Sequence, residues 1–226
     1  DLLSDQALLG ALAANASNIS SAATAPAEVL GPGTVDGMSA NGASYIVALG
    51  DSVAANVGVA SGREGYVSRV HAQLSEQDSV QYGLRNFGIS GESSGTIQRS
   101  GQLDEAIAFI EENEIAYVVI DIGANDLLGH LGSEDCSDSI EAPACQARLL
   151  PALEAYEVNL DRIMERLRDA AGADTPIVFL STYSPFSLGF SGAVGLEETA
   201  DEGTAQLNAV AEEVVARHDV LFADVA

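Results

Sequence analysis

Residues 116–122 read AYVVIDI and are followed at once by Gly123–Asp126, GAND. The segment is apolar on both faces, which is typical of a central parallel strand covered by helices on either side. It is the strongest strand signal in the chain. A polar Gly-Ala-Asn-Asp turn directly after such a strand lies where open parallel sheets bind their ligands, beyond the carboxyl ends of the strands.

Short apolar runs alternate with helical periods on both sides of this segment. The clearest helical pattern is 149–171, where apolar residues recur at spacings of four and three. Alternation of strands and helices predicts an α/β fold, a three-layer α/β/α sandwich around a mostly parallel five-stranded sheet. The predicted strands are 45–49, 82–87, 116–122, 176–180 and a last one from 220 into 224. The predicted helices carry the apolar residues of 66–74, 103–110, 149–171 and 207–214.

The first 43 residues differ from the rest in composition. They contain no Arg, and Pro26–Gly42 is rich in Pro and Gly. We interpret 1–43 as an N-terminal appendage and linker. Residues 44–226 then form the folded domain.

Charge excludes several classes of function. The 226 residues include 34 Asp and Glu against 9 basic residues, all of them Arg, for a net charge of −25. Such a surface repels nucleic-acid backbones and anionic lipid headgroups, so neither is an expected partner. No apolar run reaches the length of about 18 residues that a transmembrane helix requires. The sequence does not predict the oligomeric state.

The two cysteines, Cys136 and Cys145, lie in one short polar stretch. We predict that they form a disulfide, which indicates a secreted or extracytoplasmic protein. The alternative is two free thiols in a cytoplasmic loop. Neither a phosphate-binding loop nor a dinucleotide fingerprint is present, and the cysteines and histidines do not form a zinc set. The acidic stretch Glu134–Glu141 is better interpreted as a solvated loop than as a calcium site. We therefore expect no cofactor and no metal.

Three predicted strands end in residues suited to acyl transfer. Gly50-Asp51-Ser52 follows the first, Asn86–Ser93 with its glycines follows the second, and Asn125 follows the third. A hydroxyl that attacks a carbonyl needs nearby donors for the developing oxyanion, and Gly N–H groups and an Asn amide supply them. A more conservative interpretation is that Ser52 caps a helix while the other residues only form turns.

The three blocks, in this order, resemble the SGNH hydrolases, also called GDSL esterases and lipases. The resemblance extends from about residue 44 to the end, although Val53 replaces the usual Leu. It implies that Ser52 is the nucleophile. It also implies an oxyanion hole made by the Ser52 N–H, the Gly91 N–H and the Asn125 side-chain amide. Gly88 is the competing candidate for Gly91.

The family's last block, Asp-x-x-His, supplies the general base and is missing from this sequence. The histidines are His71, His130 and His218, and none has an Asp three residues before it. We therefore expect the base His beyond residue 226, so that 44–226 is a C-terminally incomplete SGNH domain and nearly inactive alone. We place His130 on a loop leaving the crevice, where it could line the pocket or, as a minor alternative, act as the base.

The leading hypothesis is a serine carboxylester hydrolase acting on short to medium acyl esters, with a small-molecule or lipid ester as substrate. The alternative is a non-catalytic scaffold or binding module that kept this fold and lost the base. The apolar segment Ser184–Leu196 either forms a wall of the acyl or alcohol site or packs under the sheet edge.

Overall fold

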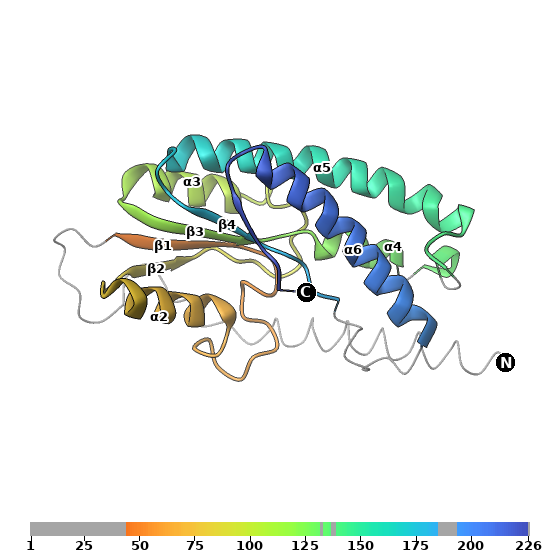
Figure 1. Ribbon diagram of the computed structural model, residues 1–226, viewed down its shortest axis with the longest axis horizontal. Coiled ribbons are helices and arrows are strands. Elements are labelled where there is room, and N and C mark those ends of the chain that lie inside the picture. The colour runs from red at the N-terminus through yellow and green to blue at the C-terminus, as the bar shows by residue number, and fades with distance from the viewer. Residues whose placement is uncertain (1–43, 132, 137–138, 185–193, 226) are drawn as a thin grey trace.

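The computed structural model describes residues 44–131, 133–136, 139–184 and 194–225. They contain a five-stranded sheet in the order β2-β1-β3-β4-β5 (Figure 1). Every pairing between neighbouring strands is parallel, which confirms the predicted α/β fold. The strands are β1 Tyr45–Gly50, β2 Gly83–Asn86, β3 Ile115–Asp121, β4 Ile177–Leu180 and β5 Leu221–Ala223.

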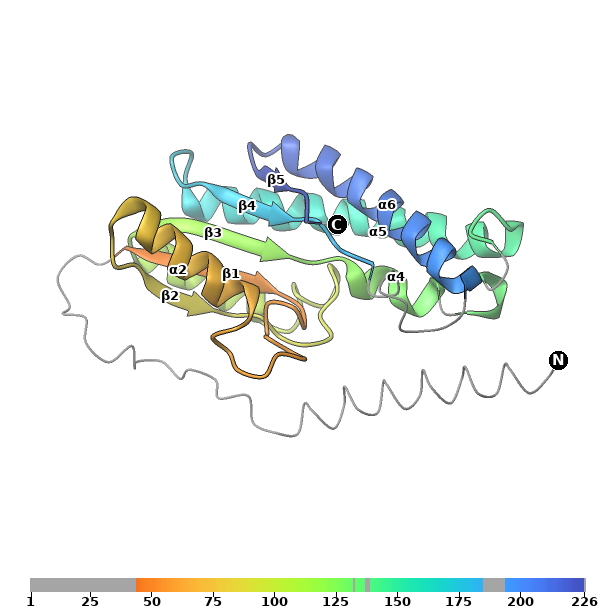
Figure 2. The same cartoon turned by 60° about the horizontal axis from the view of Figure 1, so that its bottom comes forward.

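Helices cover the two faces of the sheet unequally (Figures 1 and 2). The described helices are α2 Tyr66–Asp78, α3 Gln102–Glu112, α4 Ala124–Leu131, α5 Pro143–Ala171 and α6 Val194–Ala216, with a short 3₁₀ turn η1 at Glu134–Cys136. The connection from β1 to β2 runs one way along the sheet and the later connections run the other way. Because parallel crossovers are right-handed, α2 is placed on one face and α3, α5 and α6 on the other.

The main core lies between the sheet and the α3–α5–α6 layer. Strand residues that alternate toward this layer, such as Val47, Leu49 and Ile120, are fully buried. They pack against the apolar stripe of α5, which the spacing of four and three predicts correctly. Tyr156 of that stripe is completely buried, and its hydroxyl donates to the Ile122 carbonyl at 3.1 Å. This bond fixes α5 to the residue that directly follows β3.

Two helices differ from the sequence-based expectation. His130 lies on α4 rather than on a loop, because Leu127 and Leu131, four residues apart, are both buried on one side of that helix. Helix α5 begins at Pro143, before the predicted start at 149. Proline suits the first turn of a helix, since its missing N–H has no partner there in any case.

A disulfide joins Cys136 and Cys145, and both residues are fully buried. The Cα atoms are 4.6 Å apart, so the bond holds η1 against the first turn of α5. The structure thus agrees with the oxidised alternative for these cysteines. The segment Ser184–Leu196 was expected either to form a pocket wall or to pack under the sheet edge, and its residues 185–193 lie outside the described residues, as does the appendage 1–43. None of the described helices is long and apolar enough to cross a membrane.

Arg168 connects several segments at the amino edge of the sheet. Its guanidinium donates to four backbone carbonyls at distances of 2.7 to 3.1 Å. These carbonyls belong to Gly172, Thr175, His218 and Asp219. One side chain therefore joins the end of α5 to the turns that precede β4 and β5.

Candidate active site

The candidate site lies at the carboxyl edge of β2, β1 and β3. These three strands are adjacent and parallel, so the segments that follow them emerge at one edge. The chain leaves β1 toward β2 and later returns to β3 on the other side of β1. This change of direction is the position at which open α/β sheets bind their ligands. Ser52 follows β1, Gly91 follows β2 and Asn125 follows β3.

The Asn125 side chain connects the three segments. Its Nδ2 donates to the Glu92 carbonyl at 2.7 Å and to Asp51 Oδ2 at 3.4 Å. Glu92 is next to Gly91, and Asp51 is next to Ser52. The amide therefore lies between the segment of the predicted nucleophile and the segment of the predicted oxyanion glycine. The catalytic roles of Ser52, Gly91 and Asn125 stay predictions.

Backbone donors distinguish the two candidate glycines. The Gly88 N–H donates to Asn86 Oδ1 at 2.9 Å and is therefore occupied. The N–H groups of Ser52 and Gly91 donate to no acceptor in the described part of the chain. Asp51 Oδ1 instead accepts from the next N–H, that of Val53, at 2.9 Å. Both N–H groups that the resemblance implies are therefore free in the described structure.

The conformation of Gly91 also separates it from Gly88. Gly91 has φ +85° in a turn closed by the Glu92 N–H on the Ile89 carbonyl, a position that glycine occupies without steric cost. A Cβ at Gly91 would meet nothing within 4 Å, whereas one at Gly88 would lie 2.7 Å from Ala54 Cβ. Gly91 therefore faces open space, and Gly88 is required for close packing.

Three aspartate carboxyl groups lie at this edge in addition to the buried Glu92, and no role was predicted for any of the three. Asp51 and Asp121 are 2% and 9% exposed. Burial raises the pKa of Asp51, and burial together with the nearby Asp51 charge raises the pKa of Asp121 well above its usual range. The only sequence signal for Asp121 is an acidic residue inside an otherwise apolar strand.

The third carboxyl group, Asp126, fixes the segment between β2 and α3. Its two oxygens accept from the Ser94 N–H at 2.8 Å and the Ser94 hydroxyl at 2.6 Å. Burial raises its pKa. The Asn-Asp pair after β3 thus holds the segment between β2 and α3 at two points. Asn125 binds it at Glu92, next to Gly91, and Asp126 binds it at Ser94.

The three histidines occupy different edges. His71 Nε2 is 2.9 Å from the Tyr82 carbonyl, just before β2, and His218 Nε2 is 2.9 Å from Asp161 Oδ1, just before β5. Both therefore lie toward the amino edge of the sheet, opposite Ser52. His130 lies on α4, which leaves the carboxyl edge of β3. Its Nδ1 is buried and has no hydrogen-bond partner among the described residues.

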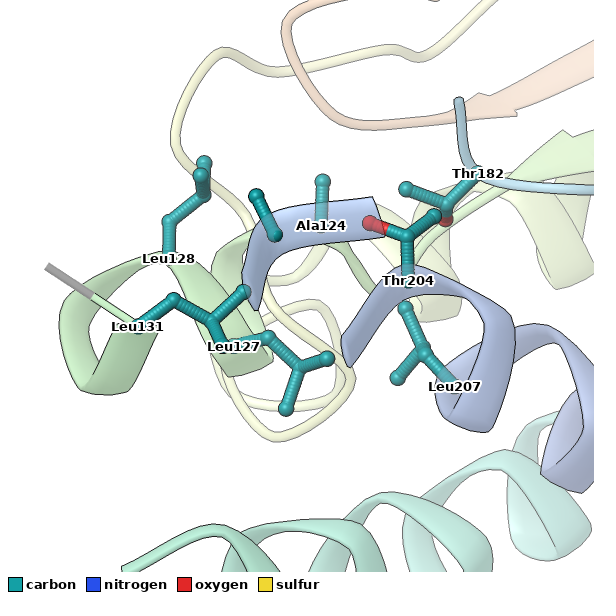
Figure 3. Close-up of a pocket in the computed structure, with 8 residues that line it drawn as sticks. Ala124, Leu127, Leu128, Leu131, Thr182, Thr204 and Leu207 are labelled. Carbon is teal, nitrogen blue, oxygen red and sulfur yellow. The ribbon is translucent and has the colours of Figure 1, made fainter. Parts of the chain in front are cut away.

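A small apolar cavity lies beside Ala124, the first residue of α4 (Figure 3). Its volume is about 10 Å³, close to the space of one water molecule. Leucines of α4 form one side, and residues of α6 with Thr182, just after β4, form the other. The lining residues are Ala124, Leu127, Leu128, Leu131, Thr182, Ala200, Thr204 and Leu207. Within the described residues, no group of three or more His, Cys, Asp or Glu could hold a metal ion.

The fold is that of the open parallel α/β proteins with a site at the carboxyl edge of the sheet, and sequence comparison gives the family. Residues 48–226 match the GDSL-like lipase/acylhydrolase family, so the chain belongs to it. Comparison with curated proteins by sequence found no significant match.

Solved structures of SGNH-type enzymes have the same fold. A lipase from a goat rumen metagenome superposes with a TM-score of 0.63 at 20% identity, covering 79% of each chain. A mutant acetyl-xylooligosaccharide esterase from Geobacillus gives 0.56 at 17% identity, covering 81% of this chain and 77% of that one. The SGNH-hydrolase family esterase AlinE4 gives 0.50 at 17% identity with the same coverage. At these identities the likeness establishes the fold.

Proposed function

We propose that this protein is a serine carboxylester hydrolase with Ser52 as its nucleophile. The observation that carries the proposal is the Asn125 amide, which lies between the segments of Ser52 and Gly91 beside two unoccupied backbone donors. Converging donors next to a serine hydroxyl suit acyl transfer, where negative charge develops on one oxygen. Membership of the lipase/acylhydrolase family supports the same chemistry.

In the proposed reaction, Ser52 Oγ loses its proton to a general base and attacks the ester carbonyl carbon. The carbonyl oxygen becomes an oxyanion that accepts hydrogen bonds from the Ser52 N–H, the Gly91 N–H and Asn125 Nδ2. The Asn125 hydrogen that makes the long 3.4 Å contact with Asp51 Oδ2 is the one shared with the oxyanion. The alcohol leaves with a proton from the base. Water then attacks the acyl-enzyme in the same way and releases the acid.

The proposed base is a histidine that follows residue 226. Because β5 is parallel to β1, the chain that leaves β5 emerges at the edge that carries Ser52. Asp224 already lies there, with Oδ1 accepting from the Ser181 hydroxyl at 3.1 Å. His71 and His218 lie toward the opposite edge. If the base is not a histidine after residue 226, His130 is the candidate base among the described residues.

We further propose short to medium acyl esters as substrates, with the acyl chain lying along the apolar cavity beside Ala124. The cavity has room for about one water molecule and is lined largely by aliphatic side chains, so it suits at most the end of a short acyl chain. Leu128→Ala should widen it and shift the preference toward longer acyl chains, by several-fold in relative kcat/KM. The matched control is Leu150→Ala on α5, which is 52% exposed and outside the cavity. Unchanged preference in Leu128→Ala would place the acyl chain elsewhere.

The test of the nucleophile is covalent labelling with a fluorophosphonate, read by intact mass and peptide mapping. We compare the 226-residue chain with a chain extended to include an Asp-x-x-His block, each with Ser52→Ala. Ser90→Ala is the control, because Ser90 is an exposed serine next to Gly91. A single adduct on Ser52 that Ser52→Ala abolishes supports the enzyme.

The same comparison identifies the base. Labelling of the extended chain alone indicates a base beyond residue 226. Labelling of the shorter chain that His130→Gln abolishes would assign the role to His130. If neither chain reacts or hydrolyses chromogenic acetate or butyrate esters, the hydrolase proposal fails and the non-catalytic scaffold is left.

A further inference from the structure

Asp51 and Asp121 come together because of one register pairing in the sheet. Gly50 of β1 pairs with Asp121 of β3. A Cβ at Gly50 would lie 2.3 Å from Asp121 Oδ1, so only glycine leaves room for this carboxyl group. This pairing brings the Asp121 side chain beside Asp51, so the two buried carboxyl groups lie close enough to interact directly.

A hydrogen bond between two carboxyl groups requires a proton, because ionised carboxylates only accept. Neither Asp51 nor Asp121 forms an ion pair with any described residue. The other polar contacts are donors to one group or the other. Tyr66 Oη donates to Asp121 Oδ1 at 2.5 Å, and the Ala54 N–H also contacts Asp121. Val53 N and Asn125 Nδ2 donate to Asp51, which the Ser52 side chain contacts as well.

We propose that Asp51 and Asp121 hold one proton between them, so that Tyr66, Asp121, Asp51 and Asn125 form a hydrogen-bonded positioning chain beside the oxyanion hole. Asp51 accepts hydrogen bonds from more donors than Asp121 does, so its ionised form is the better stabilised and the proton resides on Asp121. This inference rests on the proposed function, because it assigns the chain a role in positioning the Asn125 amide.

Charge at this edge makes the proton important for the reaction. Asp51, Asp121 and Asp126 are all acidic, and an oxyanion that forms near Asn125 adds a further negative charge. The titratable groups around the pair are Tyr66 on α2 and Asp126 on α4, and neither of them is cationic. Burial raises the pKa of both members of the pair, and the Asp51 charge raises the pKa of Asp121 further. Retaining one proton therefore keeps one negative charge away from the oxyanion.

Asp121→Asn and Asp121→Ala separate positioning from simple stability. The Asn amide is neutral at every pH and can still donate to Asp51 and accept from Tyr66. We expect Asp121→Asn to keep kcat within a few-fold near neutral pH, and Asp121→Ala to lower kcat by about ten- to a hundredfold at similar KM. In the wild type, kcat should fall as the pH rises through the pKa of the pair, whereas Asp121→Asn should lack this alkaline decrease.

The matched control, Asp78→Asn, lies at the other end of the sheet. Asp78 Oδ2 accepts from the Tyr82 and Tyr117 hydroxyls at 3.0 and 2.9 Å, so it forms a second tyrosine–carboxyl cluster far along the strands from Ser52. Asp78→Asn should leave kcat and its pH profile unchanged. If Asp121→Asn has the same alkaline decrease as the wild type, or if Asp121→Ala keeps wild-type kcat, the proposal is overturned.

A second readout does not need activity. Carbon-13 shifts of the carboxyl groups, followed between about pH 5 and 9, report protonation directly. We expect one coupled titration of Asp51 and Asp121 well above the ordinary aspartate range, which Asp121→Asn removes. Two carboxylates that are both ionised throughout would refute the shared proton even if Ser52 proves to be the nucleophile. If Ser52→Ala leaves hydrolysis intact while the coupled titration is present, the proposed function fails and the proton pair is retained as a structural feature.

Discussion

Gln102 connects the fold to the candidate site, and replacing it gives a quantitative test. It is the first residue of α3, is 2% exposed, and forms two hydrogen bonds with Gly50, directly before Asp51 and Ser52. The Gly50 N–H donates to Gln102 Oε1, and Gln102 Nε2 donates to the Gly50 carbonyl, both at 3.0 Å. Methionine has a similar length and cannot form either bond.

The expected loss follows from what remains unpaired in Gln102→Met. The Gly50 carbonyl keeps the Ile89 N–H at 3.1 Å, so the main cost is the Gly50 N–H left without this acceptor. An orphaned buried donor costs about 1–3 kcal/mol, and the second bond adds roughly 0.5–1.5 kcal/mol. We therefore expect a loss of about 2–4 kcal/mol in the free energy of unfolding. For a domain of this size, that loss corresponds to a fall in Tm of roughly 4–16 °C.

Chemical and thermal unfolding of the purified chain measures this difference. The control is Gln73→Met on the exposed side of α2, where the same change should stay within about 0.5 kcal/mol of the wild type. A folded Gln102→Met protein as stable as the Gln73→Met control would refute the assignment of the Gly50 bonds as a stabilising link. The link matters for the site because Gly50 sets the direction in which the Ser52 segment leaves β1.

Three further predictions concern stability. The hydrogen bond from His218 lowers the pKa of Asp161 in the folded protein. The pair therefore stabilises the native state above about pH 4, and this contribution is lost as the pH falls through the lower folded pKa. The free energies of urea unfolding of the wild type and His218→Ala should thus converge at acid pH. Tyr156→Phe, which leaves a buried carbonyl unpaired, should cost about 1–2 kcal/mol in denaturant unfolding. Reduction of the Cys136–Cys145 bond, which closes a short loop, should cost about 2–3 kcal/mol, and unchanged Tm in reductant would contradict this.

The order of the elements could be predicted from the sequence because each strand and long helix has its own local pattern. The apolar run before Gly123 defines β3, and the spacing of four and three defines α5. Helix α4 was missed because it is short, contains Gly129 and begins with an Asn-Asp pair that resembles a turn. It forms because tertiary packing buries Leu127 and Leu131, and such burial outweighs weak local preference.

Within the site, sequence motifs indicated the residues and the order of the blocks, and contacts between distant residues were not predictable. Gln102 and Gly50 are 52 residues apart, and no local pattern marks Gln102 as a partner of that strand end. The meeting of Asp51 with Asp121 depends on the register of β1 against β3, and a shift of one residue would send Asp121 to the other face. Register is fixed by the packed sheet as a whole, so it is seen only in the structure.

The four carbonyls bound by Arg168 indicate which parts of such a domain can vary in sequence. The Arg168 guanidinium joins the turns at the amino edge of the sheet, at the end of the strands away from Ser52. Its planar fork of donors cannot be replaced by the compact ammonium of lysine. Arg168 thus contributes stability at the edge opposite the candidate site and makes no contact with the segments at the carboxyl edge. Insertions and exchanges intended to alter substrate range should be made at that edge, and the turns held by Arg168 should be kept intact.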